Sequence, residues 1–249
     1  MDRTAFRKLF KTLGPAVLPV IHVLDAEQAS RNVRTIISGG AQGAFLINHD
    51  FSHDRLLPII EHVRTAFPAL WLGVNFLAVT GRDAFPLLGK LEKSGVPVDA
   101  YWADDARIDE RSNAQVEAVE IDRARAESGW SGLYFGGTAF KKQREVAPED
   151  YGRSAEIACR HMDVVTTSGI ATGQAADLAK IETFRQACGE HAIAIASGVT
   201  PDNVHNYARE VDAILVATGI NYEGDFYNAD PAKLRQLMDR VRTIGAGEP

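Results

Sequence analysis

The chain has no excess of basic residues, few cysteines and no long hydrophobic run. Its 27 lysines and arginines stand against 33 aspartates and glutamates, a formal net charge of −6 that offers no basic face to nucleic acid. No apolar run approaches the roughly 18 residues of a membrane span, and the start, MDRTAFRKLFKTLG, has no signal-peptide core. The two cysteines, Cys159 and Cys188, are not spaced as metal ligands. We therefore expect a cytoplasmic protein with unpaired thiols and no nucleic-acid partner.

The sequence motifs of several enzyme classes are also absent. No P-loop, GxGxxG, HExxH or paired CxxC is present, so nucleotide hydrolases, Rossmann enzymes and zinc sites have no motif support. We predict no cofactor. A divalent cation such as Mg²⁺ stays open because Asp104 and Asp105 are adjacent, although for Asp105 we favour a solvated loop in which one aspartate starts a turn.

What the sequence does contain is a regular alternation of short apolar runs and amphipathic stretches. About 250 residues is the usual size of one (β/α)8 barrel, and this chain has 249. We predict a single TIM-barrel domain over residues 1–249, with an N-terminal helix in 1–13 and the barrel in 17–243. Its strands are expected at 17–24, 44–48, 71–76, 100–103, 132–136, 164–167, 193–196 and 213–217.

Helix boundaries follow from local signals. Gln174–Ala187 has a helical pattern, and Thr200-Pro201 and Asp230-Pro231 each place a capping residue before a proline, which predicts two more helix starts. The connection Gly219–Ala229 has room for a short extra helix whose N-terminus would face an anion.

The N-terminal helix has two interpretations. Arg3–Leu13 places Phe6, Leu9, Phe10 and Leu13 on one face, with basic residues around it. We favour a helix that closes the bottom of the barrel; the alternative is a basic amphipathic element at a membrane surface.

Three consecutive strands end in a hydroxyl residue followed by glycine. Because neighbouring strand ends meet at one rim of a barrel, and glycine lets backbone N–H groups approach a ligand, we predict a phosphate site there. The alternative is that these pairs are only turns. The predicted anion-binding residues are Thr166, Ser168, Gly169, Thr172, Gly173, Ser197, Gly198, Thr218 and Gly219.

Polar residues at the ends of the other strands are the candidates for chemistry. A histidine inside an apolar strand can be a general acid or base, although an isolated case is more often a satisfied core residue. Of Lys141 and Lys142 we expect only one to point inward, since such pairs are usually solvated. The predicted catalytic residues are His22, Asn48, Asn75, Asp104 and Lys141.

With these positions in view, the chain resembles the BtpA family, also called SgcQ, of predicted TIM-barrel proteins. The resemblance is strongest in VVTTSGIATGQAADLAKIE (Val164–Glu182), and SGVTPDNV (Ser197–Val204) and DPAKLRQLM (Asp230–Met238) also fit. Family positions correspond to His22, Asn48, Asn75 and Lys141. Where the family has a lysine after its last strand, this chain reads Gly219-Ile220-Asn221, so an anion would depend on backbone donors. Family members have been linked to photosystem assembly and to sugar-utilisation operons.

These observations favour an enzyme that acts on a small phosphorylated metabolite, a sugar phosphate or phosphoribosyl compound, by isomerase or lyase chemistry. Phosphoribosyl transfer is one alternative. Others are a non-catalytic assembly factor, as the family name implies, and a regulatory barrel that binds without turnover. We expect a homo-oligomer without peripheral membrane contact.

Overall fold

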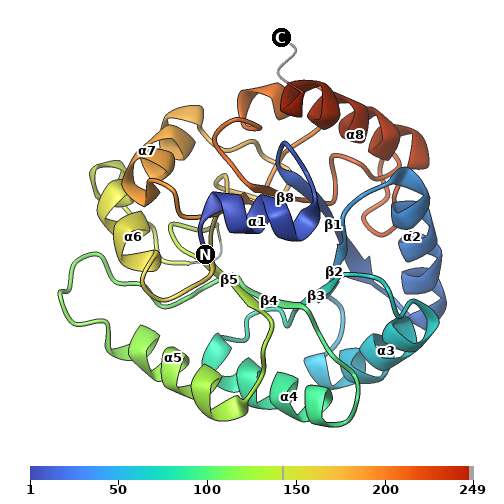
Figure 1. The fold of residues 1–249 in the computed structure, drawn as a ribbon, viewed down its shortest axis with the longest axis horizontal. Helices are drawn as coiled ribbons and strands as arrows, with labels where there is room; N and C mark the ends of the chain where they lie inside the picture. Colours follow the sequence, from blue (N-terminus) through green and yellow to red (C-terminus); the bar gives the residue numbers. More distant parts are fainter. Residues whose placement is uncertain (142, 247–249) are drawn as a thin grey trace.

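The computed structural model describes residues 1–141 and 143–246, and eight parallel strands form a closed barrel in it, in sequence order (Figure 1). The strands are β1 (Ala16–Val23), β2 (Ala44–Asn48), β3 (Leu72–Asn75), β4 (Ala100–Ala103), β5 (Leu133–Gly137), β6 (Val164–Thr167), β7 (Ile193–Ile195) and β8 (Ala213–Val216). The helices are α1 (Arg3–Phe10), α2 (Ala26–Gly39), α3 (His53–Ala66), α4 (Gly81–Lys93), α5 (Val116–Ser128), α6 (Tyr151–Ala158), α7 (Leu178–Cys188) and α8 (Pro231–Gly245), with short 3-10 helices η1 (Pro148–Asp150) and η2 (Val204–Asn206). The predicted (β/α)8 fold is confirmed.

Alternate residues of each strand face the barrel interior or the surrounding helices. In β1, His22 is in register with Ile47 of β2, and Ile47 belongs to the interior cluster. The other face of the strands packs on the helices in a second, larger cluster. Both faces are apolar because helices cover a parallel sheet on its outer side. The strand residues of the interior cluster are Ala16, Leu18, Val20, Phe45, Ile47, Ala100, Trp102, Leu133, Phe135, Val164, Ala194, Ala213 and Leu215.

Helix α1 closes the end of the barrel at which the strands begin, as we favoured from the sequence. Phe6 is buried against Phe135 of β5, with ring centroids 6.2 Å apart, and Phe10 packs on Trp71 at 4.9 Å. Figure 1 shows α1 lying across the barrel opening. Across residues 1–141 and 143–246, none of the helices combines the length and hydrophobicity that a membrane span requires.

The prediction of a helix that begins at Thr200-Pro201 is wrong, because only the short 3-10 helix η2 forms there. Asn203 and Thr200 bond to each other's backbone: the N–H of Thr200 donates to Asn203 Oδ1 at 2.8 Å and the N–H of Asn203 to Thr200 Oγ1 at 3.3 Å. Beyond them, hydrogen bonds spanning three residues (Tyr207 to Val204) alternate with bonds spanning four (Ala208 to Val204), so no continuous α-helix develops.

The short extra helix expected within Gly219–Ala229 is also wrong; these residues, all of them described, form turns. Asp225 Oδ1 accepts from the backbone N–H groups of Tyr227 and Asn228 at 2.7 and 3.0 Å, which fixes a turn. Asn221 pairs with Ala229 in an isolated antiparallel bridge. Similarly, α7 begins at Leu178 rather than Gln174, since Asp177 caps it.

Candidate functional site

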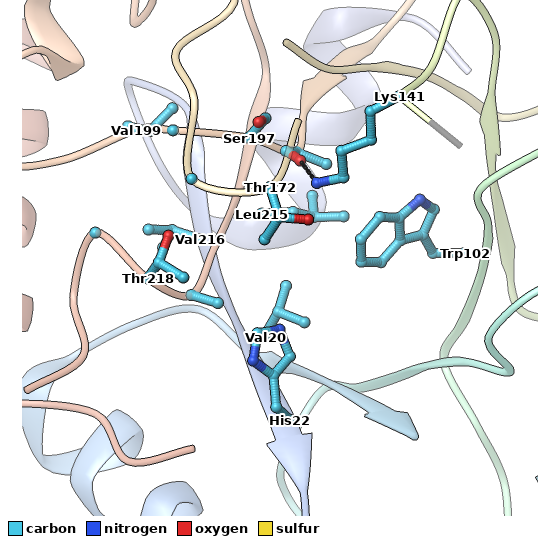
Figure 2. A pocket seen from close by; sticks show the side chains of 15 residues that line it. Val20, His22, Trp102, Lys141, Thr172, Ser197, Val199, Leu215, Val216 and Thr218 are labelled. Carbon is cyan, nitrogen blue, oxygen red and sulfur yellow. Dashed lines mark hydrogen bonds between the residues drawn. The ribbon is translucent and has the colours of Figure 1, made fainter. Parts of the chain in front are cut away.

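A pocket opens where the strands end, at the barrel mouth opposite α1. It has an empty volume of ≈ 380 Å³, part of it open to solvent. Figure 2 shows Lys141, Trp102, His22 and Thr218 around the same opening. The lining residues come from β1, β4, β8 and the loops after β5 to β8, so one cavity joins the predicted anion loops to two of the predicted catalytic side chains.

Backbone N–H groups are the donors that the two last loops offer. Among the described residues, no protein acceptor takes a hydrogen bond from the N–H of Gly198 or Val199 after β7, or of Thr218 or Gly219 after β8. All four residues line the pocket. Unpaired backbone donors from two adjacent loops form the kind of concavity that binds anions in proteins.

The glycines of these loops first serve the packing of loop on loop. Gly198 has φ +60°, and an ideal Cβ on it would lie 2.2 Å from the carbonyl carbon of Gln174. A Cβ on Gly219 would lie 1.9 Å from the carbonyl oxygen of Val199. The missing side chains therefore let neighbouring loops touch, whereas from the sequence we expected them to make room for a ligand.

Some of the predicted residues in β6 and the loop after it are buried in the protein, and others line the pocket. Thr166 and Ser168 are buried, and Ser168 Oγ accepts from the N–H of Lys141 at 3.0 Å. A Cβ on Gly169 would meet Gln174 O at 2.6 Å. Of the nine predicted anion-binding residues, the pocket is lined by Thr172, Gly173, Ser197, Gly198, Thr218 and Gly219, and not by Thr166, Ser168 or Gly169.

His22 lies at the mouth beneath the loop that follows β8. Its Nδ1 is 2.7 Å from the carbonyl oxygen of Phe226, so Nδ1 carries the proton and donates. The Phe226 ring stacks on the imidazole at 3.8 Å, and His49 meets it edge-on at 4.7 Å. This tautomer places the basic lone pair of a neutral ring on Nε2. No signal in the sequence pointed to Phe226.

Asn75 and Asp104 meet inside the barrel, and Asn48 does not join them. The Asn75 Nδ2 donates to Asp104 Oδ1 at 3.0 Å. Asn48 instead braces two loops: its Nδ2 donates to Phe51 O at 2.7 Å and its Oδ1 accepts from the N–H of Leu77 at 3.2 Å. Since Ile47 faces the interior, Asn48 faces the helices.

Lys141 reaches across the mouth to the next loop. Its Nζ donates to the carbonyl oxygen of Ala196 at 3.0 Å, the contact drawn in Figure 2, and lies 5.4 Å from the ring centre of Phe140. The neighbouring candidate, Lys142, lies outside the described residues. Lys141 thus places a cation beside the loop that carries the amides of Gly198 and Val199.

A second lysine, Lys180 of α7, supports the loop that bears Lys141. Its side chain is 8 % exposed, and its Nζ donates to the carbonyl oxygens of Ala139 at 2.5 Å and Ser168 at 2.8 Å. Ala139 has φ +45°, which few L-residues adopt, so these hydrogen bonds stabilise a strained turn. The sequence did carry a signal, because Lys180 lies four residues before the buried Phe184 on the apolar face of α7.

Burial lowers the pKa of Lys180 to about 8. Between pH 8 and the ordinary lysine pKa of about 10.4, the unfolded chain holds a proton that the folded protein has released, so this lysine makes stability rise with pH. We expect the unfolding free energy of wild type, relative to Lys180→Met, to increase by about 3 kcal/mol across that interval and to be constant below it. Urea unfolding of both proteins from pH 7 to 10.5, with NMR titration of ¹³Cε-labelled lysine, measures this. The prediction would be wrong if every lysine signal titrated above pH 10.

No metal-binding cluster is evident in the part of the chain that the structure describes. There, no group of three or more His, Cys, Asp and Glu side chains is arranged to hold an ion. Asp105 is engaged by Arg107 instead: its Oδ1 accepts from the backbone N–H of Arg107 at 2.8 Å, and its Oδ2 pairs with Nε of the same arginine at 3.3 Å.

Several solved structures share this fold over nearly the whole chain. The tryptophan synthase alpha chain of Legionella pneumophila is 15 % identical with a TM-score of 0.65, covering 99 % of each chain. Phosphoribosyl anthranilate isomerase of Thermus thermophilus is 15 % identical with a TM-score of 0.61, covering 92 % of this chain and 99 % of that one. A structure described as native KDPGal is 10 % identical with a TM-score of 0.64, covering 93 % and 96 %. At such identities these likenesses show the fold alone.

The sequence comparisons give one family. The comparison with curated proteins gives no match. Residues 142–243 match the model of the BtpA family, which confirms the resemblance inferred from the sequence over that part of the chain. The match includes the loops after β6, β7 and β8, and it excludes His22, Asn75, Asp104 and Lys141.

Proposed function

We propose that this chain, whose residues 142–243 match the BtpA family, is an enzyme that binds a small phosphorylated metabolite at the barrel mouth and acts on it by isomerase or lyase chemistry. One observation carries the proposal. The N–H groups of Gly198, Val199, Thr218 and Gly219 have no acceptor among the described residues, and all line one pocket with the ammonium-bearing Lys141. Backbone donors and a cation around one cavity favour a phosphate group.

The chemistry would be performed by groups of the same cavity. His22 Nε2 is the atom that can take up a proton, because Nδ1 donates to Phe226 O. Aldose–ketose isomerisation begins when a base removes a carbon-bound proton, and aldol-type carbon–carbon cleavage needs a base that removes a hydroxyl proton. Lys141 can polarise a carbonyl or contact the phosphate from its position near Ala196 O.

The neighbours in fold support a phosphorylated substrate without showing it. Phosphoribosyl anthranilate isomerase, by its name, acts on a phosphoribosyl compound within a barrel of the same kind. The assembly-factor alternative rests on the family name and on a basic N-terminal helix that could meet a membrane. That support is weakened, because α1 buries Phe6 and Phe10 and turns Arg3 and Arg7 toward Asp212.

The test uses a matched pair at Thr218, an exposed residue of the pocket lining. Thr218→Glu adds a carboxylate beside the expected phosphate, and Thr218→Gln adds nearly the same volume without charge. We expect Thr218→Glu to weaken binding of inorganic phosphate and ribose 5-phosphate about tenfold or more, since like charges about 4 Å apart repel by about 1–4 kcal/mol. Thr218→Gln should bind like wild type. Titration calorimetry gives the affinities, and loss of carbon-bound hydrogen from ribose 5-phosphate in D₂O reports proton transfer.

Wild type that binds neither compound, or Thr218→Glu that binds both as well as Thr218→Gln, would overturn the proposal. Bulky substitutions of Gly198 or Gly219 are unsuitable for this purpose. They would separate the loops, so a loss of binding would not identify the amides as ligands.

A further inference from the structure

Two buried polar atoms on adjacent strands inside the barrel, one of them on a residue that lines the mouth pocket, have no hydrogen-bond partner among the described residues. They are Nε1 of Trp102, whose side chain is 4 % exposed, and Oδ1 of Asn75, which is fully buried. Buried donors and acceptors in proteins are nearly always paired, because an unpaired one loses its hydration without replacement. Each such atom in a native structure therefore points to a missing partner.

Both residues face the inside of the barrel, on adjacent strands. Trp102 of β4 belongs to the interior cluster and lines the mouth pocket together with Gly198 and Gly219. In β3, a Cβ on Gly73 would meet the interior Phe45 ring at 2.3 Å, so Asn75, two residues on, faces the same way. Val74 is in register with Tyr101, which brings Asn75 level with Trp102. Figure 2 shows the Trp102 ring at the edge of the pocket, across from Thr218.

The orientation of the Asn75 amide is fixed by its neighbour. Its Nδ2 donates to Asp104 Oδ1 at 3.0 Å, and a carboxylate oxygen can only accept there. The amide cannot be flipped without placing two acceptors against each other, so the atom left over is Oδ1, an acceptor. Trp102 Nε1 is a donor only. The pair therefore leaves one donor, on a residue that lines the mouth pocket, and one acceptor on the neighbouring strand inside the barrel.

We propose that Trp102 and Asn75 form a second subsite that binds hydroxyl groups of the ligand, so that the substrate is a polyhydroxylated, sugar-like phosphate. This inference rests on the proposed function, because the phosphate would be held by the loops after β7 and β8. A hydroxyl accepts from the indole N–H and donates to the amide oxygen, either singly or as two neighbouring hydroxyls. Two other ligand groups fit less well. A ligand carboxylate has only acceptors, so it would repel the Asn75 oxygen and the Asp104 carboxylate. A ligand ammonium has only donors, so it could not accept from the Trp102 N–H.

The test compares phosphate esters with and without hydroxyls. Titration calorimetry on the full chain measures inorganic phosphate, ethyl phosphate, glycerol 3-phosphate and ribose 5-phosphate with wild type, Trp102→Phe and Asn75→Leu. For wild type we expect the hydroxylated esters to bind about tenfold more tightly than ethyl phosphate. Each variant should lower that ratio to about threefold or less, while the affinity for inorganic phosphate changes by less than about twofold.

The outcomes separate the two proposals. Wild type that fails to bind inorganic phosphate overturns the proposed function and this inference with it. Wild type that binds phosphate but takes ethyl phosphate as tightly as the hydroxylated esters overturns the subsite alone. An unchanged ratio in Trp102→Phe does the same. If Asn75→Leu does not fold by circular dichroism, Trp102→Phe and the wild-type ligand series still decide the question.

Discussion

Replacing Asp212 with asparagine is expected to lower the free energy of unfolding by about 3–5 kcal/mol. The Asp212 side chain is fully buried where the strands begin. It accepts from Arg3 Nε at 2.8 Å, from Arg185 Nη2 at 2.7 Å and from the N–H of Ile193 at 3.1 Å, with Arg7 Nη2 at 3.6 Å. Asparagine keeps the shape but removes the charge, so the guanidinium groups stay at the barrel bottom without a counter-ion.

A matched control is Asp239→Asn on α8. Asp239 pairs with Arg242 at 3.5 Å, and both side chains are largely exposed, so this change should leave stability almost unchanged. Urea unfolding of the three proteins gives the comparison, and added salt should not reduce the Asp212 effect because the site is buried. Equal midpoints for the two variants would show that α1 is not held to the barrel by this cluster.

Local signals predicted the strands well and the helices unevenly. Asp230-Pro231 begins α8 as expected, with Asp230 Oδ1 accepting from the N–H of Ala232 at 2.7 Å. Thr200-Pro201 carries the same kind of signal, and Thr200 and Asn203 do cap each other's backbone N–H, but the segment forms only η2 within a series of turns. Both segments thus have a capped start, and only the hydrogen bonds beyond the cap differ: after Thr200 they alternate between three- and four-residue spans.

The site was predicted in part, for a reason that lies in the sheet. Every residue of β2, Ala44–Asn48, is buried, so alternation of polar and apolar residues does not tell which side faces the interior. If the assumed alternation is shifted by one residue, His49 rather than Asn48 is expected to face the interior. The structure places His49 against His22. Trp102 was overlooked for the same reason. His22 and Lys141 were found because each is polar at the end of an apolar run.

Replacing Gly219 with alanine is expected to lower the free energy of unfolding by about 2–3 kcal/mol and to weaken phosphate binding as well. The new Cβ would lie 1.9 Å from Val199 O and 3.2 Å from Thr200 Cα. Both are backbone atoms, so no flexible side chain can move aside and the loops after β7 and β8 must separate. That separation would displace the N–H groups of Gly198 and Val199 from those of Thr218 and Gly219.

Gly152→Ala provides the contrast, because its Cβ would meet only Thr183 Cγ2 at 3.7 Å and Ala187 Cβ at 3.9 Å, ordinary contact distances. In α6, alanine should raise stability by about 0.5 kcal/mol through the lower entropy of the unfolded chain. Urea unfolding and phosphate titration of both variants test the pair. A Gly219→Ala protein as stable as Gly152→Ala, with phosphate affinity unchanged, would mean that the two loops tolerate separation. Packing of one loop on the other would then not be what positions the backbone N–H groups of these loops. The geometry proposed for the anion site would lose its physical basis.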